Sequence, residues 1–179
     1  MNSISRRGQT ALITGGGSGI GLAIATRLHQ LGMKVILASR RLELLSEQVA
    51  ILNQDGQNQA FALAIDVRDR QSVITALAEL PTDFADIDVL INNAGLGVGY
   101  SIEDCPEEDW DLVIDTTLKG PFLVTQAMLP IMKPKGAGVI INIASQAAKH
   151  GYANAGPYCA AKFGLVGFAK ALQEEVRPF

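Results

Sequence analysis

The amino-acid sequence predicts an α/β domain built on a doubly wound parallel β-sheet. Short runs rich in Val, Ile and Leu alternate with longer amphipathic or small-residue stretches. Continuous apolar runs of this length are typical of strands buried on both faces, as in a parallel sheet covered by helices. This βα alternation occurs five times, which indicates one sheet with helices on both of its faces.

The elements follow from local signals along the chain. Pro106 and the acidic residues after it favour a helix start, whereas Gly32 and Gly56 stand where helices are expected to end. The amide-rich segment 53–59 is interpreted as a solvated turn. The predicted strands are residues 10–14, 34–39, 60–65, 88–92 and 138–144. The predicted helices are residues 19–31, 42–53, 69–80, 106–132 and 157–176.

The composition excludes several classes of protein. The 179 residues are 48% hydrophobic and 18% charged with a formal net charge of −3, which fits one folded domain and lacks the basic surface of a nucleic-acid binder. No apolar run is long enough to cross a bilayer, and the stretch after Arg6-Arg7 is too short for an export signal. Two cysteines are too few for a disulfide framework. We therefore expect a cytoplasmic protein with no nucleic-acid or membrane partner.

A glycine-rich turn, TGGGSGIG at residues 14–21, follows the first predicted strand. A phosphate binds at a helix N-terminus only if the backbone turns sharply and no Cβ atom blocks its approach. The spacing is GxxxGxG and departs from the GxGxxG pattern of many dinucleotide folds. Because the turn joins a strand to a helix, dinucleotide binding is favoured over a plain loop. The residues expected at the cofactor are Gly15, Gly17, Ser18, Gly19, Ile20 and Gly21.

The tip of the second predicted strand indicates which dinucleotide is bound. An acidic residue there would bond the ribose 2′-hydroxyl of NAD, whereas an Arg accommodates the 2′-phosphate of NADP. The strand ends in Ser39, Arg40 and Arg41, and Glu43 falls in the first turn of the next helix, where acids are common. The sequence therefore predicts NADP(H), with Ser39 and Arg40 at the phosphate. Ordinary solvated arginines are the alternative.

Three side chains in the last third of the sequence form a candidate catalytic group. Tyr158 and Lys162 are four residues apart, so on a helix they lie one turn apart on the same face. A neighbouring ammonium favours the phenolate form of a tyrosine, which then serves as a general acid or base near neutral pH. Ser145 follows the last predicted strand, beside the crevice where open α/β sheets bind ligands. Without Ser145, a Tyr and a Lys at this spacing would indicate only the edge of an amphipathic helix.

In combination, these motifs resemble the short-chain dehydrogenase/reductase family of the usual kind. The resemblance rests on the glycine-rich turn, Asp66-Val67, the NNAG run at 92–95, Ser145, and Tyr158 with Lys162. It implies a Rossmann-like sheet in strand order 3-2-1-4-5. It also implies hydride transfer between NADP(H) and a small-molecule carbonyl or alcohol substrate.

The resemblance implies a role for each matching residue. Tyr158 would donate a proton to the carbonyl being reduced, Lys162 would bind the nicotinamide ribose, and Ser145 would hydrogen-bond the substrate oxygen. Asp66 and Val67 would flank the adenine. Support for the sheet and contacts to the adenosine ribose are expected from Asn92, Asn93, Ala94 and Gly95.

The sequence departs from the family pattern at Thr117 and at its end. Thr117 stands where the family commonly has an Asn that holds a water linking the Lys to solvent. A hydroxyl is shorter than an amide, so we expect a proton relay with less help from Thr117 and equal or higher activity for Thr117→Asn. We expect residues 1–179 to form one domain that lacks the family's C-terminal strands and substrate lid. We expect part of a longer protein, or a short form that needs a partner strand beside the fifth strand.

Partners and substrate are expected from the same resemblance. The helix at 106–132 and the small residues of the last helix resemble a two-fold interface, which implies a homodimer or homotetramer. No metal site is predicted, because His29 and His150 are isolated from each other and from the cysteines. Candidate substrates are 3-oxoacyl thioesters and sugar, polyol or xenobiotic carbonyls, since residues 96–104 and the lid set this choice. The competing function is a non-catalytic NADP(H)-binding sensor.

Overall fold

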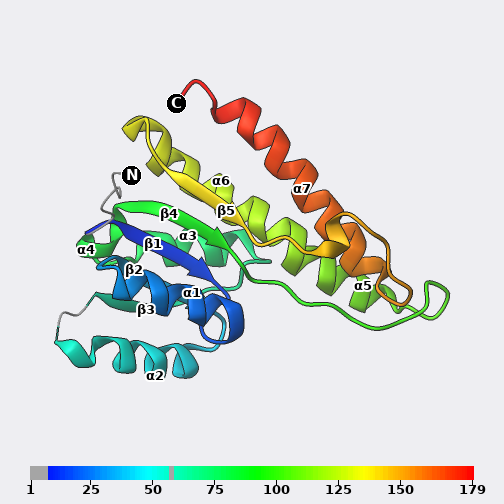
Figure 1. Ribbon diagram of the computed structural model, residues 1–179, viewed down its shortest axis with the longest axis horizontal. Helices are drawn as coiled ribbons and strands as arrows, with labels where there is room; N and C mark the ends of the chain where they lie inside the picture. Colours follow the sequence, from blue (N-terminus) through cyan, green and yellow to red (C-terminus); the bar gives the residue numbers. More distant parts are fainter. Residues whose placement is uncertain (1–7, 57–58) are drawn as a thin grey trace.

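The computed structural model describes residues 8–56 and 59–179, which form a five-stranded sheet with helices on both faces (Figure 1). Arg6-Arg7 and residues 57–58 of the amide-rich segment lie outside the described residues. The order β3-β2-β1-β4-β5 and the parallel pairing of every neighbour confirm the predicted topology. The strands are β1 (Thr10–Thr14), β2 (Lys34–Ser39), β3 (Ala60–Ala64), β4 (Ile87–Asn92) and β5 (Val139–Asn142).

Helices connect successive strands, as parallel pairing requires. The α-helices are α1 (Gly19–Gln30), α2 (Leu42–Leu52), α3 (Arg70–Ala78), α4 (Thr82–Ala85), α5 (Glu107–Ile114), α6 (Gly120–Met132) and α7 (Gly156–Val176). Shorter helical turns are η1 (Asn53–Asp55), η2 (Asp115–Lys119), η3 (Lys133–Lys135) and η4 (Gln146–Ala148).

Alternate residues of the central strands enter two separate cores. Leu12 and Ile36 pack with side chains of α3 and α6 on one face of the sheet, whereas Ile13 and Leu37 pack with α1 and α2 on the other. All four side chains are fully buried, so β1 and β2 are apolar on both faces. This double burial is the physical reason that continuous apolar runs identified the strands.

The predicted helix over 106–132 is wrong as a single helix. It begins at Glu107 and is interrupted by the π-helical turn η2 between α5 and α6. At the end of this turn a Cβ on Gly120 would lie 2.8 Å from Cγ2 of Val67. The glycine therefore allows the interrupted helix to approach the chain after β3, and such insertions are frequent at functional sites.

Other boundaries shift by a few residues. The helix predicted over 69–80 ends at Ala78, because Pro81 disfavours helical backbone before it, and the unpredicted helix α4 follows. Strands β3 and β5 end earlier than predicted, since the chain turns at Asp66 and at Ser145, the N-cap of η4. The amide-rich segment begins as the turn η1, where the Asn53 side chain pairs with both backbone groups of Ala60.

Two features matter for the functional site: the exposed edge of the sheet and the elements that extend beyond the C-terminal ends of the strands. Strand β5 is the edge strand after β4, and Ile141 in it is 43% exposed. Figure 1 shows α5, the loop before it and the start of α7 extending beyond the C-terminal ends of the strands. In the described part of the chain, no helix combines the length and apolar character needed to cross a membrane.

Candidate functional site

A cavity of about 640 Å³ lies at the C-terminal ends of the strands. Ligands of open α/β sheets bind at this edge, because the strand order reverses there and helix N-termini face the crevice. The cavity runs from the glycine-rich turn after β1 to the catalytic candidates on α7. It is lined by Gly15, Ser18, Ile20, Ala38, Ser39, Arg40, Arg41, Ile65, Asp66, Val67, Arg68, Asn93, Ala94, Gly95, Leu96, Gly97, Thr116, Ile143, Ala144, Tyr158 and Lys162.

The glycine-rich turn leaves no room for side chains at two of its positions. A Cβ on Gly15 would lie 2.8 Å from Nδ2 of Asn93, and one on Gly21 would overlap the carbonyl oxygen of Gly15. Gly15 and Gly19 also have φ values of +65° and +54°, which favour glycine. Of the predicted residues, Gly15, Ser18 and Ile20 line the cavity, whereas Gly17, Gly19 and Gly21 shape the turn behind it.

Hydrogen bonds tie the end of β1 to the residues after β4. The Thr14 hydroxyl accepts from the N–H groups of Asn93 (3.0 Å) and Ala94 (3.1 Å) and donates to the carbonyl of Ile91 (3.4 Å). In return, Asn93 Nδ2 donates to the carbonyls of Thr14 (3.0 Å) and Gly15 (3.3 Å). These contacts hold Gly15, Asn93 and Ala94 together on one wall of the cavity.

The end of β2 presents two exposed arginines to the cavity. Ser39 Oγ accepts a hydrogen bond from the backbone N–H of Arg41 (3.2 Å), which fixes the turn into α2. Arg40 and Arg41 both line the cavity, as does Ser39. Within residues 8–56 and 59–179, the Arg40 guanidinium makes no hydrogen bond or ion pair. It is therefore available to an anionic ligand.

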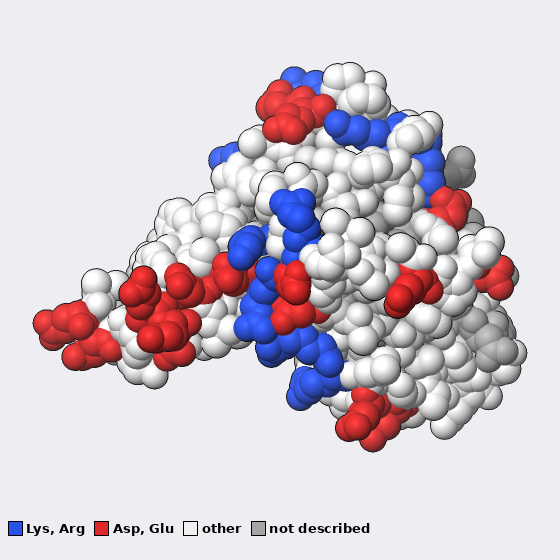
Figure 2. Space-filling model, turned by 180° about the vertical axis from the view of Figure 1, so that it is seen from behind, with Lys and Arg blue, Asp and Glu red and all other residues white. Residues whose placement is uncertain are grey.

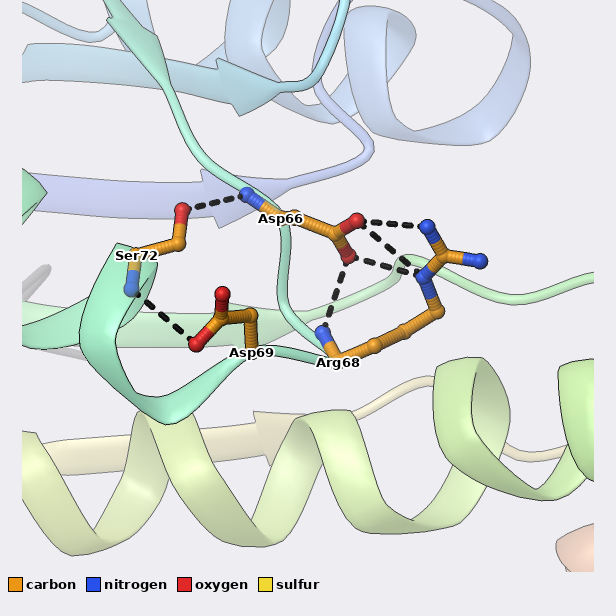
Figure 3. Close-up of polar contacts among 4 residues, drawn as sticks. All are labelled: Asp66, Arg68, Asp69 and Ser72. Carbon is orange, nitrogen blue, oxygen red and sulfur yellow. Dashed lines mark hydrogen bonds and ion pairs between the residues drawn. The ribbon is translucent and has the colours of Figure 1, made fainter.

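The turn after β3 holds a carboxylate against an arginine (Figure 3). Asp66 accepts from Arg68 through the backbone N–H (3.0 Å), Nε (2.9 Å) and Nη2 (2.6 Å). Asp69 caps α3 by accepting from the N–H of Ser72 (3.4 Å), and the Ser72 hydroxyl accepts from the N–H of Asp66 (2.9 Å). The Arg68 side chain, assisted by the charge of Arg40, lowers the pKa of Asp66, so this carboxyl stays ionised.

Tyr158 and Lys162 share one side of α7 and face the cavity. Lys162 Nζ lies 5.6 Å from the Tyr158 ring centroid and donates to the carbonyl of Ile143 (2.6 Å). Lys162 is only 4% exposed, and burial lowers the pKa of its ammonium. The opposite wall approaches closely, since a Cβ on Gly97 would lie 3.3 Å from the Tyr158 ring. The predicted Tyr–Lys pair is thus placed together beside the loop after β4.

Ser145 and Thr117 stand beside the cavity and do not line it. Ser145 follows Ala144, a lining residue, and its Oγ accepts from the N–H of Ala147 (3.2 Å). Thr117 is fully buried in η2, where its hydroxyl accepts from the N–H of Leu96 and donates to its carbonyl, both at 3.2 Å. Thr117 therefore anchors the loop that carries Leu96 and Gly97.

Asn92, which was expected to support the sheet, makes hydrogen bonds to neighbouring elements. This residue is 2% exposed, and its Nδ2 donates to the Asn142 side chain (2.9 Å) and to the Thr125 hydroxyl (3.1 Å). These bonds join β4 to β5 and to α6. Asn92 itself does not line the cavity.

Several lining residues were absent from the sequence-based prediction. Arg41, Arg68 and Thr116 are the polar ones, whereas Leu96 and Gly97 belong to the loop at 96–104 that was expected to set the choice of substrate. The sequence offered a signal for Arg68, because a cation two residues after an expected adenine-binding Asp can reach its carboxylate. No such signal existed for Thr116, whose exposure to the cavity depends on the π-helical turn η2.

The charges are distributed unevenly over the surface. Figure 2 shows basic side chains gathered in a band on the back face and acidic ones on the narrow end. That end carries the exposed acids Glu103, Asp104, Glu107, Glu108 and Asp111.

Among the described residues, no group of three or more His, Cys, Asp or Glu side chains could hold a metal ion.

Comparison with known proteins identifies the family of this chain. The family model described as short chain dehydrogenase matches residues 9–179, and the chain therefore belongs to that family. It is 38% identical over 170 residues to the NADP-dependent 3-hydroxy acid dehydrogenase of Schizosaccharomyces pombe, covering 94% of this chain and 66% of that protein. It is 37% identical over 170 residues to a 3-oxoacyl-[acyl-carrier-protein] reductase of Haemophilus influenzae, covering 95% and 69%.

A solved structure shows the same fold. The closed form of a serine dehydrogenase complexed with NADP⁺ matches with a TM-score of 0.89 and 37% identity, covering 94% of this chain and 66% of that one. The chain thus spans about two thirds of the length of the relatives it matches. The family assignment, the sheet and its strand order were all correctly predicted from the sequence.

Thr117→Val tests the anchoring of the loop by Thr117. The change removes the hydroxyl with little change of shape and leaves both backbone groups of Leu96 without this partner. We expect the free energy of unfolding to fall by about 1–2 kcal/mol and the Leu96 amide to exchange faster with solvent. Thr116→Val is the matched control, and equal stability of the two variants would contradict the anchoring role.

The buried Lys162 predicts a pH-dependent stability. Because burial lowers its pKa in the folded chain, the unfolded chain binds more protons between that pKa and the ordinary value. The stability of the wild type should therefore rise relative to Lys162→Met as the pH increases through this alkaline interval. Denaturant unfolding at a series of pH values measures it, and parallel pH curves for the two chains would show that no such shift exists.

Proposed function

We propose that the protein is an NADP(H)-dependent oxidoreductase that interconverts a carbonyl and an alcohol. The observation that carries this proposal is one cavity that joins the glycine-rich turn, the Arg40 side chain and the Tyr158–Lys162 pair. The names of its relatives, a 3-hydroxy acid dehydrogenase and a 3-oxoacyl reductase, support the same class of reaction. The sensor hypothesis has no such support.

The lining residues fit an extended dinucleotide. The absence of side chains at Gly15 and Gly21 allows the tight turn that leads into α1, and the dipole of α1 would favour a pyrophosphate at its N-terminus. Arg40 and Ser39 would hold a 2′-phosphate, while Asp66 and Val67 flank the adenine. Asn93, Ala94 and Gly95 would contact the adenosine ribose, and Lys162 the nicotinamide ribose. The NADP⁺ complex of the serine dehydrogenase supports the choice of cofactor.

The catalytic groups divide the remaining chemistry among them. The nicotinamide, when bound, supplies or accepts the hydride. Tyr158 donates its phenolic proton to the substrate oxygen during reduction, and the nearby Lys162 ammonium stabilises the resulting phenolate. Ser145 uses a lone pair for the N–H of Ala147, which leaves its O–H for the substrate oxygen. Thr117 acts through the loop that it anchors and would help the proton relay less than the Asn that the family commonly has at this position.

The choice of substrate depends on the loop at 96–104. Its Tyr100 N–H donates to the carbonyl of Asn154 (3.1 Å), so the loop is held against the turn before α7. Ile102 in this loop is 74% exposed and lies close to Gly156 at the start of α7. The two residues of this loop that line the cavity with Tyr158, Leu96 and Gly97, are apolar, which suits a carbonyl substrate with an apolar portion, such as an oxoacyl chain, better than sugar or polyol carbonyls.

The assembly and the compartment are part of this proposal. Phe122 on α6 packs edge-on against Phe168 on α7, and Phe122 and Phe163 are 38% and 47% exposed. Exposed aromatic rings on two adjacent helices favour a homodimer or homotetramer formed through this pair of helices. Cys105 and Cys159 are free thiols, which suits the reducing cytoplasm.

Tyr158→Phe tests the catalytic assignment. In the full native protein we expect kcat/KM for NADPH-dependent ketone reduction to fall by about 10²–10⁴-fold, because the general acid is lost. The Kd for NADPH should change little. Tyr152→Phe removes the phenol of an exposed tyrosine six residues earlier and should keep full activity. Unchanged turnover in Tyr158→Phe would refute the mechanism, and NADPH binding without turnover of any ketone in the wild type would favour the sensor.

A comparison of NADPH with NADH tests the cofactor. Arginine pairs with a phosphate through charge-assisted hydrogen bonds, so NADPH should bind at least about tenfold more tightly than NADH. The Kd values for the full native protein, measured by isothermal titration calorimetry, give this ratio. Tighter binding of NADH would overturn the assignment of Ser39 and Arg40.

A further inference from the structure

Three arginines and one carboxylate line the adenosine end of the cavity. Arg40 and Arg41 come from the end of β2, and Asp66 and Arg68 come from the turn after β3. Their formal charges sum to a positive value, which suits a phosphate. The single carboxylate is unfavourable for that ligand, since it repels the phosphate and attracts any guanidinium nearby.

The carboxylate of Asp66 is engaged within its own turn. Arg68 Nε lies 2.9 Å from Oδ1 of Asp66, and Arg68 Nη2 lies 2.6 Å from Oδ2, so both carboxylate oxygens are engaged (Figure 3). The side chain of Asp66 is 27% exposed and that of Arg68 is 30% exposed, so the ion pair is partly shielded from solvent. Because the guanidinium contacts both carboxylate oxygens, this pair is stronger than an ordinary surface ion pair. Asp115, the other acid that acts on Arg68, is paired with Lys119 (3.2 Å).

Arg40 is the next cation within electrostatic reach of this carboxylate. The hydrogen bond from Arg68 and, to a smaller degree, the charge of Arg40 lower the pKa of Asp66. Arg68 already occupies both carboxylate oxygens, and Arg40 makes no ion pair among the described residues. If Arg68 were removed, Asp66 would be left with a free charge beside Arg40.

We propose that Arg68 is a positioning residue for cofactor selection: it neutralises Asp66 and thereby keeps Arg40 available for the 2′-phosphate. The proposal deepens the proposed function and rests on it. Arg68 acts here through Asp66 and Arg40 and does not itself hold the phosphate. Its loss should weaken binding of NADP⁺ and leave NAD⁺ little affected, because only NADP⁺ carries the 2′-phosphate.

Isothermal titration calorimetry of the full native protein with NADP⁺ and with NAD⁺ tests this proposal. The quantity compared is the ratio of Kd for NAD⁺ to Kd for NADP⁺ in the wild type, Arg68→Gln, Asp66→Asn and the double variant. Arg70→Gln is the matched control, because it removes the same charge at a position two residues further along the chain. The Arg70 side chain bonds Gln126 and does not line the cavity. Arg68→Lys keeps the charge and serves if Arg68→Gln unfolds.

The double variant separates the proposed role from direct contact. Arg68→Gln should lower the ratio by about tenfold, and Arg70→Gln should keep the wild-type ratio. In the double variant no carboxylate remains to attract Arg40, so the ratio should return to that of Asp66→Asn. Arg68→Lys should fall between the wild type and Arg68→Gln, since a lysine neutralises the charge without the bidentate fork.

If the wild type binds NADP⁺, two results would overturn the positioning role of Arg68 and leave the proposed function intact. One is an unchanged ratio in Arg68→Gln or, if that variant unfolds, in Arg68→Lys. The other is a tenfold loss that persists in the double variant relative to Asp66→Asn, which would mean that Arg68 contacts the phosphate directly. A wild-type protein that binds neither nucleotide would instead overturn the proposed function, and this proposal with it.

Discussion

The hydrogen bonds between the end of β1 and the residues after β4 are the constraint on which the site depends. The hydroxyl of Thr14 and the side-chain amide of Asn93 satisfy each other's backbone groups across two adjacent strands. They bring Asn93 so close to the glycine-rich turn that no Cβ fits at Gly15 or Gly21. One cavity wall is thereby set by backbone and amide contacts.

At the opposite end of the cavity, the site contains a buried cationic side chain, Lys162. Burial of the Lys162 ammonium costs solvation, and its hydrogen bond to the carbonyl of Ile143 offsets only part of that cost. The carbonyl belongs to the segment directly after β5, the edge strand, which Asn92 and Asn142 join to β4 by a side-chain hydrogen bond. The pairing of β5 with β4 thus holds in place the carbonyl that the buried Lys162 ammonium contacts.

The sequence predicted the features that depend on local pattern. Double burial of β1 and β2 appears directly as continuous apolar runs, and the strand–glycine–helix order located the glycine-rich turn between β1 and α1. Features that depend on three-dimensional packing were not accessible. The π-helical turn η2 has no sequence signal, so neither the division of the helix at 106–132 nor the contact of Thr117 with Leu96 could be foreseen. The same holds for Arg41, whose position at the cavity follows from the turn that leads from β2 into α2.

The proposed function requires one extended cofactor that spans the cavity from Arg40 to Lys162. A crystal structure of the full native protein with NADP⁺ tests it most directly. We expect the 2′-phosphate within hydrogen-bond distance of Arg40, the pyrophosphate at the N-terminus of α1, and the nicotinamide ribose at Lys162 Nζ. A nucleotide bound in the reverse direction, or a 2′-phosphate remote from Arg40, would contradict it.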